Sequence, residues 1–183
     1  MTLSPRIIAA VFALATAPAF AAENPMVGGA AMYETKNIVE NAVNSADHTT
    51  LVDSAKAAGL VETRASDGPL TVFAPTNEAF AKLAKGTVED LLKPENKDML
   101  VKILTCHVVA ADAMSDAIKG MIADDGGTHA VPTVGGCTLQ AKMDGDWIKL
   151  TDERGRTATV TIADVKQSNG VMHVIDTVLL PAG

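Results

Sequence analysis

Apolar residues in the first half of the chain recur every three or four positions, which is the period of a helix with one buried face. The stripe is clearest between Met114 and Ile122, where Ala117, Ile118 and Met121 complete one apolar side. The pattern predicts helices at about 36–43, 49–58, 76–85, 87–92, 94–104 and 114–122.

The period of the apolar residues changes to two from His129 onward, as expected for strands with one buried face. Strands are predicted at about 129–134, 137–143, 147–151, 157–165 and 171–180, separated by turns rich in Gly, Asp and Asn. Short turns between such strands are typical of antiparallel hairpins. Helices in the first half and strands in the second predict an α+β fold with a mainly antiparallel sheet.

The segment from Gly68 to Leu83 joins the two kinds of structure. Residues 70–73 read as a strand, which Pro75 ends because proline has no N–H to donate to a neighbouring strand. Thr76 then suits the N-cap of a helix, since its hydroxyl can accept a hydrogen bond from the N–H of Glu78 or Ala79. The segment therefore predicts a strand that turns directly into a capped helix.

Three segments together resemble the fasciclin-like domain family. A-P-T-N-E-A-F, within 74–80, resembles the family's first motif, and S-N-G-V-M-H-V-I-D-T-V-L-L-P, at 168–181, resembles the second. Leu104 to Val109 is similar to a third segment, in which cysteine stands here in place of the tyrosine of a Tyr-His pair. The resemblance covers Thr35 to Pro181 and implies a β-sandwich flanked by helices.

The start of the chain has the features of a secretory signal peptide. Arg6 precedes an apolar run from Ile7 to Phe20, and Ala19-Phe20-Ala21 fits a small-x-small cleavage site. We expect cleavage after Ala21, a flexible leader at 22–34 and a fasciclin-like domain at 35–181. The mature protein is then predicted to be secreted or periplasmic.

Charge and hydropathy argue against two classes of partner, nucleic acid and the interior of a membrane. The chain carries 22 acidic and 15 basic residues, a formal net charge of −7, without a basic cluster. Such a chain is not suited to binding nucleic acid, which depends on neutralising phosphates. The apolar run near the start is too short to span a bilayer, so we predict no membrane insertion.

The two cysteines, Cys106 and Cys137, are predicted to form a disulfide, because export places them in an oxidising compartment. A catalytic Cys106–His107 dyad was the competing interpretation, but neighbouring residues of a strand point to opposite faces. A metal site formed by these cysteines with His107 and His129 lacks the usual ligand spacing. We therefore predict no catalytic residue, no metal and no cofactor.

The family motifs also single out polar residues inside apolar segments. They are Thr76, Asn77, His107, His173 and Asp176. A carboxylate such as Asp176 among aliphatic residues requires hydrogen-bond partners. We expect a network in which Asp176, Thr76 or Asn77, and a histidine join the two motifs, and the same residues are candidates for contact with a partner.

Fasciclin-like domains are extracellular interaction modules, so the resemblance implies an adhesion module rather than an enzyme. Its partner would be a surface protein or a polysaccharide, bound near the two motifs and the segment from Cys106 to Asp112 by a monomer or weakly self-associating chain. An alternative is an envelope carrier of small molecules or lipids, with a pocket lined by Met99, Met114 and Met121. An envelope enzyme is a third, weaker hypothesis.

Overall fold

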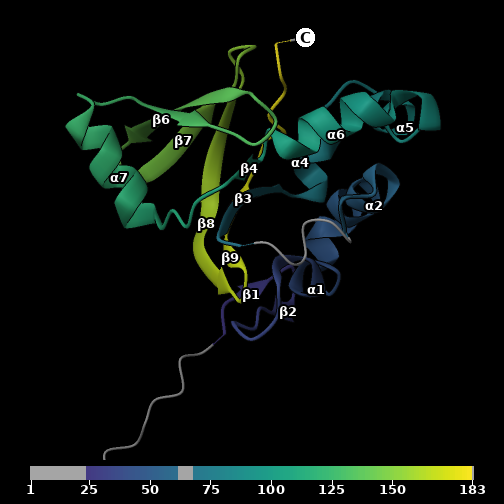
Figure 1. Cartoon of the computed structure of the whole chain (residues 1–183), viewed down its shortest axis with the longest axis horizontal. Helices are drawn as coiled ribbons and strands as arrows, with labels where there is room; N and C mark the ends of the chain where they lie inside the picture. Colours follow the sequence, from purple (N-terminus) through teal and green to yellow (C-terminus); the bar gives the residue numbers. More distant parts are fainter. Residues whose placement is uncertain (1–23, 62–67, 183) are drawn as a thin grey trace, which may run out of the picture.

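A computed structural model describes residues 24–61 and 68–182 of the chain (Figure 1). The predicted signal peptide, residues 1–21, lies outside the described residues. The described part contains a seven-stranded sheet, with most helices on one side of it and a single helix, α7, on the other (Figure 1). The predicted α+β class, a mainly antiparallel β structure with helices concentrated in the first half, is confirmed.

The sheet has the strand order β4-β3-β9-β8-β7-β6-β5. Its strands are β3 (Leu70–Pro75), β4 (Val108–Val109), β5 (His129–Pro132), β6 (Thr138–Asp144), β7 (Trp147–Thr151), β8 (Thr157–Gln167) and β9 (Gly170–Ile175). The long strand β8 pairs with β7 through residues 157–159 and with β9 through residues 160–167. It therefore passes from one half of the sandwich to the other, with two register shifts between Val160 and Val165.

The parallel pair β3–β9 brings the two family motifs side by side. Leu70 lies opposite Gly170 and Pro75 opposite Ile175, whereas the other neighbouring strands run antiparallel. A Cβ on Gly170 would lie 1.9 Å from the carbonyl oxygen of Leu70. The start of the pair therefore requires glycine, which explains the Asn-Gly of the second motif.

Over residues 24–61 and 68–182, five α-helices lie on one side of the sheet, together with two short 3₁₀ turns (Figure 1). The helices are α1 (Ile38–Ala42), α2 (Thr49–Ala58), α4 (Asn77–Ala81), α5 (Thr87–Leu91) and α6 (Lys97–Thr105), and the turns are Ala46–His48 and Pro94–Asn96. The hydroxyl of Thr76 accepts the N–H of Ala79 at 3.3 Å, so this threonine caps α4 as predicted. Gly59 ends α2 with φ of +73°, in the left-handed conformation that glycine tolerates.

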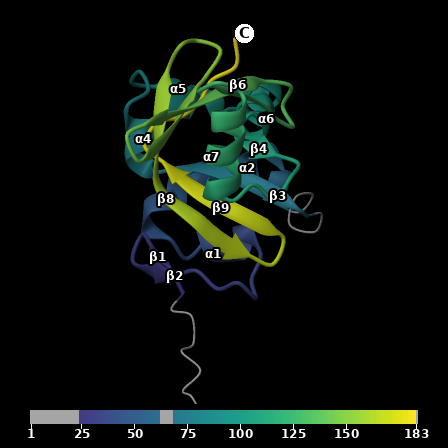
Figure 2. The ribbon, with the colours of Figure 1, turned by 90° about the vertical axis from the view of Figure 1, so that its left-hand side faces the viewer.

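Helix α7 (Ser115–Asp124) lies across the other side of the sheet, in front of it in Figure 2. Ile118 and Ile122 enter an apolar core with Leu139, Ile148 and Leu150 of the antiparallel strands. A second core lies between β3, β8 and β9 and the first helix. Together these cores fix the sheet between its two helical layers.

The segment predicted to be a flexible leader packs against the domain. Residues Met26–Val27 and Ala30–Ala31 form the antiparallel hairpin β1–β2, and Val27 and Met32 are buried in the second core. Two-residue strands are too short for a recognisable period, so the apolar pattern does not predict this hairpin. The structure thus differs from the expectation over residues 24–32.

Two predicted strands are shorter than expected. The strand expected over 106–109 is reduced to Val108 and Val109, which pair with β3, because Cys106 is the C-cap of α6. Strand β9 ends at Ile175, and the chain from 176 to 182 continues without regular structure. The predicted Cys106–Cys137 disulfide is confirmed, with a Cα–Cα distance of 5.4 Å.

Candidate functional site

The two motifs meet where β3 and β9 end. The Thr76 N–H donates to the carbonyl of Ile175 at 3.3 Å, and the Lys82 ammonium donates to the carbonyl of Asp176 at 2.6 Å. The Asp176 carboxylate accepts the N–H of Thr159 at 2.8 Å and lies 3.7 Å from Lys82. Thr76 and Asp176 are thus brought together, through backbone groups and Lys82.

Asn77 fastens the first motif to the helices beside it. Its amide oxygen accepts the N–H of Thr50 at 3.0 Å and the hydroxyl of Thr49 at 3.2 Å. Its amide nitrogen donates to the carbonyl of Ala46 at 2.8 Å. These three bonds give Asn77 a structural role at the start of α2.

A shallow hollow of about 130 Å³ opens over this junction, lined by Asp47, Thr76, Asn77 and Glu78. We call these four residues, together with Lys82 and Asp176, the motif surface. Glu78 and Lys82 are exposed, so the surface is polar and carries both signs of charge.

His107 lies inside the molecule, away from the motif surface. Its ring is 2% exposed, with Nδ1 2.8 Å from the carbonyl of Ile103 and Nε2 3.0 Å from the N–H of Leu179. Because Nε2 accepts a hydrogen bond, Nδ1 carries the proton and donates. His107 therefore joins the end of α6 to the second motif.

His173 is also buried, on β9, and stacks on Phe73 with ring centroids 5.7 Å apart. Its Nδ1 accepts the N–H of Asp164 at 3.2 Å, so Nε2 carries the proton and donates to the carbonyl of Ala113 at 2.8 Å. Neither His107 nor His173 bonds to Asp176, so the predicted histidine contribution to the junction is not found.

Burial sets the charge of these histidines. It lowers the pKa of His107 to about 4 and also lowers the pKa of His173, because a charged imidazole loses its hydration inside the protein. Both ring nitrogens of each histidine are occupied by backbone partners. In this arrangement neither ring has a free nitrogen for proton transfer or for a metal.

Two aspartates accept hydrogen bonds from backbone N–H groups close to the histidines. The sequence motifs did not point to either of them. Asp164 accepts the N–H of Ser115 at 2.6 Å and has φ of +61°, the left-handed region. Asp152 is buried and accepts the N–H groups of Arg154, Arg156 and Leu180. The apolar positions of β8 change phase between Ile162 and Val165, and this break could have pointed to Asp164.

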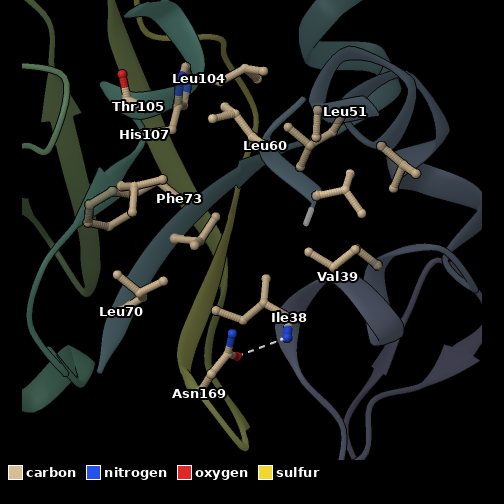
Figure 3. Close-up of a pocket in the computed structure, with 16 residues that line it drawn as sticks. Ile38, Val39, Leu51, Leu60, Leu70, Phe73, Leu104, Thr105, His107 and Asn169 are labelled. Carbon is tan, nitrogen blue, oxygen red and sulfur yellow. Dashed lines mark hydrogen bonds between the residues drawn. The ribbon is translucent and has the colours of Figure 1, made fainter. Parts of the chain in front are cut away.

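An apolar cavity of about 100 Å³ lies between the first two helices and strands β3 and β4 (Figure 3). Its walls are mainly aliphatic, with His107 and Thr105 at one end and Asn169 at the other. The lining includes Ile38, Val39, Ala42, Leu51, Val52, Ala55, Leu60, Val61, Leu70, Val72, Phe73, Leu104 and Val108. The expected lining by methionines is wrong, since Met99, Met114 and Met121 all lie elsewhere.

Two further features concern the described residues alone. Over 24–61 and 68–182, His, Cys, Asp and Glu side chains are not grouped in threes that could hold a metal ion. In the same part of the chain, none of the helices combines the length and apolar character that crossing a bilayer requires.

The family model described as Fasciclin domain matches residues 46–181, which is most of the chain. The chain belongs to the fasciclin domain family. The protein sll1483 of Synechocystis is 45% identical to this fasciclin domain over 159 residues, covering 87% of this chain and 81% of that protein. A mycobacterial relative, the cell surface glycolipoprotein MPB83 of Mycobacterium bovis, is 32% identical over 168 residues, covering 88% of this chain and 69% of its own.

A solved structure has the same fold. It is the domain pair of the insect cell adhesion molecule Fasciclin I, with a TM-score of 0.53 and 27% sequence identity. The match covers 71% of this chain and 42% of the insect chain, which contains two domains. The fold expected from the sequence resemblance is therefore confirmed.

Proposed function

We propose that this fasciclin domain is an exported interaction module that makes contacts at a cell surface or matrix. It would be secreted or periplasmic after cleavage behind Ala21, with residues 35–181 as the functional unit. The partner would be a surface protein or a polysaccharide, bound by a monomer or a weakly self-associating chain. Adhesion and surface location are properties that the names of the insect and mycobacterial relatives state for those proteins.

The observation that carries this proposal is the construction of the motif surface. The residues beneath it are fixed by hydrogen bonds from several elements, while Glu78 and Lys82 stay exposed. A rigid surface loses little conformational entropy when a partner binds. The buried histidines lie elsewhere and hold α6, α7 and the second motif together, since each is bonded on both ring nitrogens.

Attachment of cells tests the proposal. A deletion strain should attach to surfaces and aggregate less than its parent, and purified protein should restore both properties. The charge reversal Glu78→Lys should weaken this rescue, because it alters the motif surface without removing a buried contact. Glu89→Lys is the matched control, since Glu89 is also exposed in the first turn of a helix.

Two results would contradict the proposal. The deletion strain could attach and aggregate as its parent does, or the Glu78→Lys and Glu89→Lys proteins could restore attachment equally well. The first would remove the adhesion role, and the second would remove the motif surface as its site.

A carrier of apolar ligands is the second candidate, favoured by the cavity between the first helices and β3. Benzene, which suits a small apolar cavity, should then raise the melting temperature of the purified protein in a saturable way. Val72→Trp would fill the cavity and abolish that rise, whereas Val43→Trp, at the exposed C-cap of α1, would leave it in place. A melting temperature that benzene does not change would contradict binding in this cavity.

A further inference from the structure

The single tryptophan of the chain, Trp147, lies at the surface instead of in a core. It begins β7 and is 54% exposed, although tryptophan is the largest apolar side chain. Its neighbours along the turn are the exposed residues Asp144 and Asp146. An exposed aromatic ring among charged groups contributes nothing to a core, so the fold alone does not account for it.

A hollow of about 130 Å³ lies beside this tryptophan. Besides Trp147, its apolar members are Ile148, Val160 and Ala163, and its polar members are Asp146, Thr161, Ser115 and Lys119. The Lys119 ammonium has only a loose ion pair with the exposed Asp116, at 3.8 Å. Carboxylate, hydroxyl and ammonium groups are thus gathered around one aromatic ring.

The hollow opens where β7 and β8 separate. Their pairing runs from Thr151↔Thr157 only as far as Lys149↔Thr159, while β7 continues two residues further, to Trp147. Beyond this pairing the facing backbone edges of the two strands are not joined in a ladder. They add backbone donors and acceptors to the polar groups of the hollow.

These features fit a sugar better than a peptide. A pyranose ring has an apolar face of C–H groups that stacks on an indole and a rim of hydroxyls that bind polar groups. The opening exposes only the first two residues of β7, which is less edge than most added strands would need. One aromatic ring among charged groups also offers little of the clustered aromatic contact that anchors protein partners.

We propose that Trp147 and this hollow form a binding site for a pyranose of a surface polysaccharide. The indole stacks on the sugar ring, and Asp146, Thr161 and Lys119 bind its hydroxyls. This saccharide site is separate from the motif surface. It rests on the proposed function for its polysaccharide partner and places that partner at Trp147, whatever the motif surface binds.

Tryptophan fluorescence reports directly on this site because the chain has no other tryptophan. Cellohexaose, chitohexaose and mannohexaose are titrated into the purified oxidised protein, and at least one should change the emission in a saturable way. Calorimetry with the same sugar should show that Trp147→Ala weakens binding by about tenfold or more, the effect of losing one stacked ring. Trp147→Phe should retain part of the affinity.

Tyr33→Ala is the matched control, because Tyr33 is also an exposed aromatic residue and lies outside the hollow. Circular dichroism establishes that each variant is folded. The proposal is overturned if none of the three sugars gives a saturable signal, or if Trp147→Ala binds as tightly as the original protein. A loss of cell attachment in Trp147→Ala without any sugar binding would also overturn it, and would assign the site to a protein partner.

The attachment assay separates this proposal from the proposed function. If sugar binding fails while purified protein still restores attachment, the saccharide site is wrong and the interaction module stands.

Discussion

His107 and His173 are neutral because the surrounding residues leave no room for a second ring proton. Each ring accepts one backbone N–H and donates to one backbone carbonyl, and burial lowers the pKa of both. Burial lowers the pKa of His48 as well. Acid should therefore destabilise the domain through its histidines before most carboxylates titrate.

The sign of this effect follows from the protons bound in each state. Below an unfolded pKa of 6.5, His107 gains a proton in the unfolded chain but stays neutral in the folded one until about pH 4. The free energy of unfolding should fall by about 2 kcal/mol from about pH 7 to about pH 5 on account of His107 alone. Urea unfolding across this range measures it.

His107→Gln should be less stable than the original protein at neutral pH but should lose less stability on acidification. The control is His129→Gln, which changes a histidine at the surface that pairs with Asp125. A pH dependence that His107→Gln leaves unchanged would contradict the account of this residue.

At the residue scale, the motif resemblance singled out residues that lie close together in the structure, but not the contacts that each one makes. The motif resemblance pointed to Thr76, Asn77 and Asp176, and the structure places all three around one junction. The motif resemblance does not indicate that His107 faces inward and binds the N–H of Leu179. Leu179 lies in residues 176–182, which have no regular structure and therefore no apolar period to interpret. The exposure of Trp147 was not predictable, since the alternation of residues in β7 does not say which face of the strand is covered.

At the element scale, helix α7 depends on a residue from another strand. Its N-cap, Met114, provides no side-chain cap, and the first N–H of the helix donates to Asp164 of β8. The Ser115 hydroxyl also donates to Asp164, whose own N–H donates to His173. Asp164 of β8 thus joins α7 through its carboxylate and β9 through its backbone N–H.

Replacing this carboxylate should loosen the helix from the sheet. Asp164→Ala should lower the free energy of unfolding by about 2 kcal/mol, because it removes charge-assisted hydrogen bonds and places alanine at positive φ. Asp164→Asn should cost less, since asparagine keeps an acceptor and tolerates the left-handed region. Urea denaturation at neutral pH gives both values.

Asp116→Ala serves as the control, since Asp116 lies in the first turn of the same helix with its side chain in solvent. If Asp164→Ala costs no more than Asp116→Ala, the carboxylate of Asp164 does not hold α7 in place.

The ends of elements were the least predictable part of the fold. The run Cys106 to Val109 reads as a strand, yet α6 continues through Thr105 with Cys106 as its C-cap, and the strand is only two residues long. Strand β9 stops at Ile175, although the N–H of Asp176 still donates to the carbonyl of Thr159 in β8. Tertiary contacts decide both boundaries, and a single sequence does not contain them.

At the scale of the whole molecule, the order of helices and strands was predictable from the sequence. The pairing of the strands and the packing of the elements were less predictable. The change of apolar period separates the helical half from the strand half, and export predicts the disulfide between Cys106 and Cys137. The parallel pairing of β3 with β9 connects residues about a hundred positions apart, and only the motif resemblance hinted at it. The hairpin β1–β2 and the apolar cavity arise from packing alone.

The central claim is that the folded fasciclin domain acts by binding at a surface. Saturable binding of fluorescently labelled, oxidised protein to intact cells of the deletion strain tests it most directly. The account predicts binding that unlabelled protein displaces and that thermally unfolded protein lacks. Binding that rises in proportion to concentration, or that unlabelled protein fails to displace, would contradict it.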